Sequence, residues 1–126
     1  MAKGDIKGDE AVVIELTAVD AVAKGDVVHC TSASGWDQAG ANDIGKFAVA
    51  IEASSNAVFR AVIWGRVEVQ CASGAEAIPI GATAIAAASG KIAVQSFTDK
   101  SNNYGIGTVM DASSNSLQTI WVGLVN

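Results

Sequence analysis

Apolar residues recur along the chain in short runs that are separated by turns rich in glycine, serine and asparagine. In the run over residues 46–52, Phe47, Val49 and Ile51 alternate with smaller or polar residues and would share one face of a strand. The other runs that predict strands cover residues 11–16, 27–31, 58–70, 79–85, 91–97, 104–111 and 117–125. Gly65 interrupts the longest run, and a glycine inside a strand indicates a bulge or a bend.

The kinds of apolar residue favour the same fold class. Valine and isoleucine together number 26, whereas the chain has only three leucines. β-Branched side chains prefer a pleated sheet, and helical proteins depend more on straight-chain residues such as leucine. A chain of 126 residues is enough for one domain. We therefore expect an all-β fold, a single compact β-barrel or sandwich of short strands.

The two halves of the chain resemble each other in the order of their turns and strands. The segment Glu52–Asn56 corresponds to Asp111–Asn115, 59 positions later, and an Ile-Trp pair follows in each half, at residues 63–64 and 120–121. The glycines at positions 25 and 35 have counterparts at positions 81 and 90. We predict one β-domain over residues 11–126, built from two related halves at about 23–70 and 79–125.

The first ten residues differ from the rest of the chain. They alternate charged residues with glycine, and Ile6 is the one residue among them that could be buried in a core. Such a segment has too little apolar surface to fold by itself. The sequence predicts a flexible polar N-terminal arm over residues 1–10.

Charge and cysteine content exclude several classes of partner and compartment. The net charge is −5 and only eight residues are basic, so the clustered positive charge that nucleic acid requires is missing. No apolar run approaches the roughly 20 residues of a membrane-spanning helix, and the N-terminus lacks the pattern of a signal peptide. Two cysteines are too few for a disulfide scaffold, which predicts reduced thiols and a cytoplasm, or a particle assembled in one.

Residues that could carry catalysis are scarce. His29 is the single histidine, its neighbour Cys30 would point to the opposite face of the same strand, and Cys71 is 41 positions further on. This set does not supply the three or four spaced ligands of a zinc site. Glu52 and Asp111 occupy equivalent places in the two halves, but both precede turns, where acidic residues are common. We expect no catalytic set, no metal and no cofactor, so the chain is predicted not to be an enzyme.

The three tryptophans lie in different contexts. Trp64 and Trp121 belong to apolar runs and are predicted to be pillars of the core. Trp36 lies in a polar stretch. There it either anchors an interface or stacks on a sugar, or else it folds back over its own hairpin. The many small apolar residues exceed what a core of this size can bury, which favours self-association.

Three segments resemble the small phage proteins that are known as capsid cement or head-decoration proteins. They are Ala23-Lys24-Gly25-Asp26-Val27-Val28, Asp43-Ile44-Gly45-Lys46-Phe47-Ala48-Val49-Ala50 and Ala61-Val62-Ile63-Trp64-Gly65-Arg66-Val67. The later elements Ile80-Gly81-Ala82 and Ile106-Gly107-Thr108-Val109 extend the resemblance over residues 11–125. The family's usual alanine-glycine pair after the middle strand is replaced here by Ser54-Ser55-Asn56.

The resemblance implies a structural protein of the virion that binds the major capsid protein on the outer surface of an expanded phage head, commonly as a homotrimer, and stabilises the head. On this reading the arm would become ordered on the capsid, with Lys3, Asp5, Ile6 and Lys7 as its contact residues. The alternative is a carbohydrate- or surface-binding β-module that uses Trp36.

Overall fold

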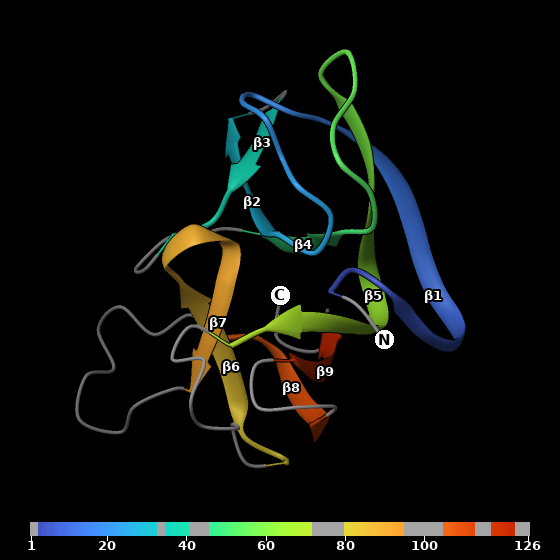
Figure 1. Ribbon diagram of the computed structural model, residues 1–126, viewed down its shortest axis with the longest axis vertical. Helices are drawn as coiled ribbons and strands as arrows, with labels where there is room; N and C mark the ends of the chain where they lie inside the picture. The colour runs from blue at the N-terminus through green and yellow to red at the C-terminus, as the bar shows by residue number, and fades with distance from the viewer. Residues whose placement is uncertain are drawn as a thin grey trace.

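The structure is a computed structural model that describes residues 3–32, 35–40, 46–71, 80–94, 105–112 and 117–122. These residues form nine β-strands and a single turn of 3-10 helix, Ala88–Gly90, with no α-helix in the same ranges (Figure 1). The strands are β1 (Ile6–Thr17), β2 (Val27–Ser32), β3 (Gly35–Gln38), β4 (Phe47–Ala50), β5 (Val58–Gln70), β6 (Thr83–Ala87), β7 (Lys91–Val94), β8 (Gly105–Ala112) and β9 (Leu117–Val122). The described part of the chain has no helix that could cross a membrane. The predicted all-β class is confirmed.

All the strands belong to one antiparallel sheet that curls into a half-barrel (Figure 1). The strand order is β3-β2-β4-β5-β9-β8-β6-β7, and β1 pairs with β5 outside this path. Val62 of β5 is paired with Val49 of β4 and with Val13 of β1, so β4 and β1 lie on opposite edges of β5. Residues 65–70 of β5 then pair with β9. The long strand β5 is therefore the element that joins the two parts of the sheet.

The strand order follows the same pattern in the two halves of the chain. The first half runs β3-β2-β4-β5 and the second runs β7-β6-β8-β9, and the halves meet through β5 and β9. Their entry turns are built alike: the N–H of Gly25 donates to the carbonyl of Ala50 at 2.7 Å, and the N–H of Gly81 donates to that of Val109, also at 2.7 Å. Both glycines have a positive φ, near +90°, a conformation that is costly for residues with a side chain.

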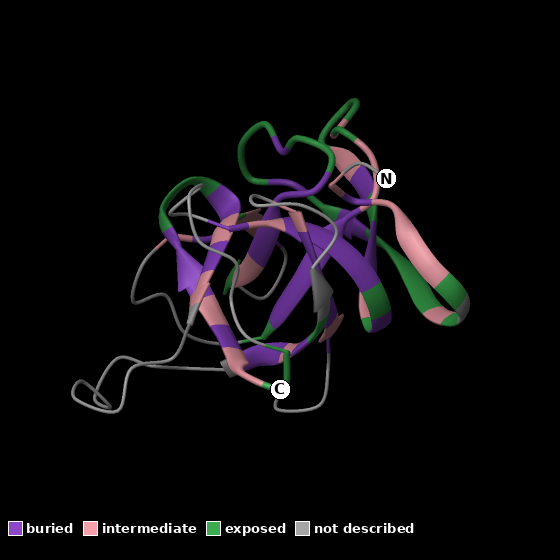
Figure 2. Ribbon diagram, turned by 60° about the horizontal axis from the view of Figure 1, so that its bottom comes forward, coloured by how far each residue is buried: buried purple, intermediate pink, exposed green. Residues whose placement is uncertain are grey.

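The core consists of two clusters of buried apolar side chains. Figure 2 colours the buried residues purple along the ribbon. The larger cluster draws on both halves, and its largest fully buried members are Ile92, Ile106 and Ile120. The smaller cluster gathers around Phe59 and Leu16, between β1, β5 and the first half of the sheet. β5 contributes side chains to both clusters, and therefore the face of β5 that packs against the core changes along the strand.

β5 changes the face that it presents to the core just before Gly65. Val62 and Val67 both point into the larger cluster although they are five residues apart, an odd separation that would place them on opposite faces of a regular strand. Val62 is opposite Val13 of β1 and Trp64 is opposite Val12, so Ile63 is an extra residue in β5. Gly65, with φ +134°, lies two positions further on, where the register with β1 shifts again between Lys7 and Val12. The irregularity that the sequence predicts at Gly65 is thus present, with the extra residue of β5 at Ile63.

The N-terminal residues are not the flexible arm that the sequence predicts. Residues 6–10 are the start of β1, with Ile6 opposite Val67, and the N–H of Gly4 donates to the carbonyl of Glu68 at 2.7 Å. A free edge of β5 supplies the hydrogen bonds that these polar residues lack by themselves, which is why an apolar-poor segment becomes ordered. Residues 1–2 lie outside the described residues.

Each of the expected arm residues already has an intramolecular contact. Lys3 packs on the turn at Gly25, with its Nζ 3.8 Å from a carboxylate oxygen of Asp26. Asp5 accepts a 2.7 Å hydrogen bond from Lys24. Ile6 packs against the larger core cluster. These contacts contradict a role for residues 3–6 as part of a detached strand that waits for a capsid edge.

Candidate functional site

β5 places its polar side chains on the face of the sheet that is turned away from the core. After Gly65, Val67 and Val69 point into the larger cluster, and therefore Arg66 and Glu68 project from the outer face. Neither alternation nor composition alone gives this result, because the extra residue at Ile63 decides which of the following side chains point outward.

Neighbouring strands add to the same face, because directly paired residues point the same way. Arg66 is opposite Lys7 on β1 and Trp121 on β9, and Glu68 is opposite Thr119. We call this surface the Trp64 face, and it comprises Lys7 and Val12 of β1, Trp64 and Arg66 of β5, Met110 of β8, and Thr119 and Trp121 of β9.

The sequence predicts that Trp64 and Trp121 are pillars of the core. In the structure they instead form a pair on this outer face. Their rings meet edge to face with centroids 4.7 Å apart. Trp64 is 39% exposed and belongs to neither core cluster. The extra residue of β5 between Val62 and Trp64 explains why the prediction for Trp64 was wrong, since a regular strand would have placed Trp64 on the same side as the buried Val62. Trp121 is partly buried, and its indole N–H is buried without a hydrogen-bond partner among the described residues.

A buried carboxylate lies beside the aromatic pair. Glu68 is 0% exposed, and its Oε1 accepts a 2.6 Å hydrogen bond from the hydroxyl of Thr119, which is also buried. The ammonium of Lys7 lies 3.7 Å from the same oxygen. Burying a charge is costly unless it is paired and hydrogen-bonded, and these two groups supply that compensation.

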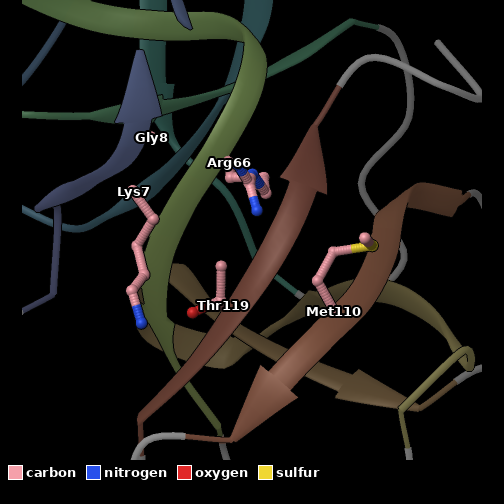
Figure 3. Close-up of a pocket in the computed structure, with 5 residues that line it drawn as sticks. All are labelled: Lys7, Gly8, Arg66, Met110 and Thr119. Carbon is pink, nitrogen blue, oxygen red and sulfur yellow. The ribbon is translucent and has the colours of Figure 1, made fainter. Parts of the chain in front are cut away.

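A pocket of about 280 Å³ opens on the Trp64 face, and its lining residues are Lys7, Gly8, Arg66, Met110 and Thr119. Figure 3 shows the side chains of Lys7, Arg66, Met110 and Thr119 projecting from β1, β5, β8 and β9, with Gly8 beside them on β1. Met110 reaches the pocket from an irregularity of β8, where the register shifts between Val109 and Asp111, and it is 42% exposed. The pocket thus combines two cationic side chains, a hydroxyl and a flexible apolar side chain.

Trp36 is not in a loop. It belongs to β3, is paired with Cys30 of β2, and packs partly buried against the smaller core cluster. Its carbonyl accepts a 2.8 Å hydrogen bond from the N–H of Val19. Of the two sequence interpretations, this placement matches the tryptophan that folds back over its own hairpin.

The other candidate groups do not converge. The ring of His29 stacks on Phe47 with centroids 6.4 Å apart, and Cys71 is buried in the larger cluster. In the described part of the chain, no three histidine, cysteine or acidic residues are grouped so that they could hold a metal ion. Arg60 donates hydrogen bonds of 2.9 and 3.1 Å to Glu52, which hold the pKa of that carboxyl below its ordinary value. The side chain of Asp111 lies outside the described residues.

No protein-family model and no curated protein matches the chain by sequence. Among solved structures, it is similar to the head fiber gp8.5 N base of bacteriophage phi29, with a TM-score of 0.60 and 16% identity, over 90% of this chain and 94% of that one. The chain has the fold of a phage head-fibre base.

The residues of the Trp64 face were only partly predictable. The sequence draws attention to Trp64, as a core residue, and to Lys7, as part of the N-terminal arm, rather than as members of one face. It offers no reason to select Arg66 or Met110. The available signal was Gly65, because a glycine inside a strand indicates a nearby irregularity, and the extra residue at Ile63 changes which side chains of β5 face outward.

Proposed function

We propose that this chain is a structural, non-enzymatic protein of a phage head, and that it attaches to the head's outer surface. The observation that carries the proposal is the fold shared with a phage head-fibre base over nearly the whole of both chains. The segments that resemble capsid cement proteins support the same conclusion from the sequence, since they suggest the same particle by a separate argument.

We propose further that the attached protein acts as a cement, which holds the head together from outside, and that it assembles as a homotrimer. Its main contacts with the capsid would be made through the β-domain, because the N-terminal residues are already paired with β5 as part of β1. Weak contacts suffice in such an assembly, since several linked copies bind far more tightly than one.

Binding to heads tests the proposal directly. Heads of the phage whose genome encodes the chain are prepared without it, mixed with the purified protein, sedimented and imaged. Saturable co-sedimentation with density at regular positions on the shell is expected. Absence of binding to expanded heads would contradict the attachment, and unchanged resistance of the decorated heads to heat would contradict the cement role. Sedimentation equilibrium of the free protein tests the trimer.

The carbohydrate-binding alternative loses its structural basis at Trp36, whose ring packs partly buried against the smaller core cluster. A glycan array with Trp36→Ala as the control separates the alternatives. A glycan that binds the wild type and not the variant would favour the alternative over attachment to the head.

A further inference from the structure

Arg66 carries a positive charge on the Trp64 face that no residue in the described part of the chain matches. Lys7 and Glu68 lie 3.7 Å apart and offset each other's charge. The guanidinium of Arg66, in contrast, has no hydrogen bond or ion pair within the described residues. Arg60 on the same strand is different, because Glu52 holds it through two hydrogen bonds.

The position of Arg66 is built into the backbone around it. A Cβ added at Gly8 would lie 2.6 Å from the terminal nitrogen Nη2 of Arg66, so the guanidinium occupies the space that the missing side chain leaves. Gly8 has φ +84°, which a residue with a side chain rarely adopts. The bend of β1 thus brings its backbone against the guanidinium and keeps the cation at the pocket.

The surroundings of the cation are apolar and exposed. Val12, Trp64 and Met110 are 45%, 39% and 42% exposed, and all three belong to the Trp64 face. Tryptophan, arginine and methionine are the residue types that protein–protein interfaces enrich relative to the rest of the surface. A central arginine with an apolar rim is the arrangement of an interface hot spot.

We propose that the Trp64 face docks onto an acidic side chain of the phage-head protein to which the chain attaches. An aspartate or glutamate of that protein enters the pocket and accepts two parallel hydrogen bonds from Arg66, while apolar neighbours pack on Trp64 and Met110. The inference rests on the function proposed above and names the surface and the partner chemistry. The carboxylate matches the planar fork of a guanidinium, which binds it through two bonds.

Charge complementarity decides between this partner and two others. A chain of net charge −5 repels a polyanion, and the apolar rim would stay uncovered beside a phosphate backbone. A second copy of the chain that docked face to face about a two-fold axis would bring the two Arg66 guanidinium groups together, which is unfavourable. A copy in the proposed trimer would meet this face with a different surface, and the oligomeric state of the variant below separates that occupant. A carboxylate on another protein would pair with the charge of Arg66, and the apolar residues around that carboxylate would cover the apolar rim.

The test compares Arg66→Ala with Arg60→Ala in full-length protein. Both residues are exposed arginines of β5, but Arg60 is held by Glu52 and lies outside the Trp64 face. Each protein is titrated against heads prepared without the chain, at low and at high salt. Thermal unfolding and sedimentation equilibrium of each free variant show whether its fold and oligomeric state are intact.

We expect Arg66→Ala to weaken binding to the heads at least about tenfold and to flatten its salt dependence, as loss of an interface hot spot does. Arg60→Ala should bind like the wild type, and Met110→Ala should weaken binding without changing the salt dependence. If the wild type binds and Arg66→Ala binds equally well, the docking surface is wrong and the proposed function stands. If Arg66→Ala alters the oligomeric state, the occupant is a second copy and the inference is overturned. If the wild type does not bind, the proposed function fails and the inference with it.

Discussion

The hydrogen bond between Thr119 and Glu68 gives a sharp test of how the Trp64 face is built. The substitution Thr119→Val keeps the shape of the side chain and replaces the hydroxyl by a methyl group. It removes the 2.6 Å donor to a carboxylate that is 0% exposed, and water cannot easily replace that donor because Thr119 itself is 2% exposed. The cost is therefore the loss of a buried charged hydrogen bond rather than the creation of a cavity.

The expected magnitude follows from these contacts. Hydrogen bonds to charged groups contribute about 1.5–3 kcal/mol, and we expect Thr119→Val to lower the free energy of unfolding by about 2 kcal/mol. With an unfolding entropy of about 2.1 cal/mol/K per residue, this loss corresponds to a decrease in Tm of about 8 °C for a chain of this length. Lys7 remains beside Glu68 in the variant, at the observed 3.7 Å, so the carboxylate keeps one compensating charge.

The assay is urea denaturation of the wild type, Thr119→Val, Glu68→Leu and the double variant, with the m-value as a check on two-state behaviour. In the Glu68→Leu background the same substitution should cost less than about 0.5 kcal/mol, since the acceptor is gone. Thr108→Val is the matched control, because Thr108 lies opposite Trp121 on the neighbouring strand β8 and no hydrogen bond of its hydroxyl is described. A loss below about 0.5 kcal/mol in Thr119→Val, or an equal loss in both backgrounds, would refute the reasoning.

Three further predictions concern the rest of the fold. Ala57 occupies a tight turn with φ +62°, and Ala57→Gly should raise the free energy of unfolding by about 0.5–1 kcal/mol in urea denaturation, because glycine adopts this conformation without strain; a loss of stability would contradict the turn geometry. A Cβ at Gly107 would overlap the carbonyl oxygen of Trp121, so Gly107→Ala should lower Tm strongly, and an unchanged Tm would show that β8 and β9 are not packed as described. Arg60 lowers the pKa of Glu52, so the stabilisation from this pair is present above the ordinary carboxyl pKa of 4.5 and is lost as the pH falls through the lowered value. The small difference in Tm between the wild type and Glu52→Gln should therefore disappear in acid, and a difference that grows there would contradict the assignment.

Local patterns predicted the repeated parts of this fold well. Gly25 and Gly81 were matched by their positions in the two halves, and the structure shows the same hydrogen bond at both entry turns. Gly65 was expected to bend β5, and it does. These features depend on short segments, where the need for a positive φ or a break in alternation leaves a mark in the sequence.

Predictions that depended on distant partners were less successful. The first ten residues have few apolar side chains, yet they are ordered because β5 offers a free edge to Ile6 and Lys7. Trp64 was predicted to be buried because its run is apolar, and a one-residue shift at the bulge turned it to the outer face. In each case another strand, or the register with it, decided the outcome.

The sequence by itself determined the strand content and the turns, because β-branched runs and glycine positions act over a few residues. Only the tertiary structure decided which side of each strand meets the core and which residues meet across strands. A strand alternates with period two, so a shift of one residue exchanges its faces without changing its composition. The pocket at Arg66 exists because that shift placed side chains from four strands on one surface.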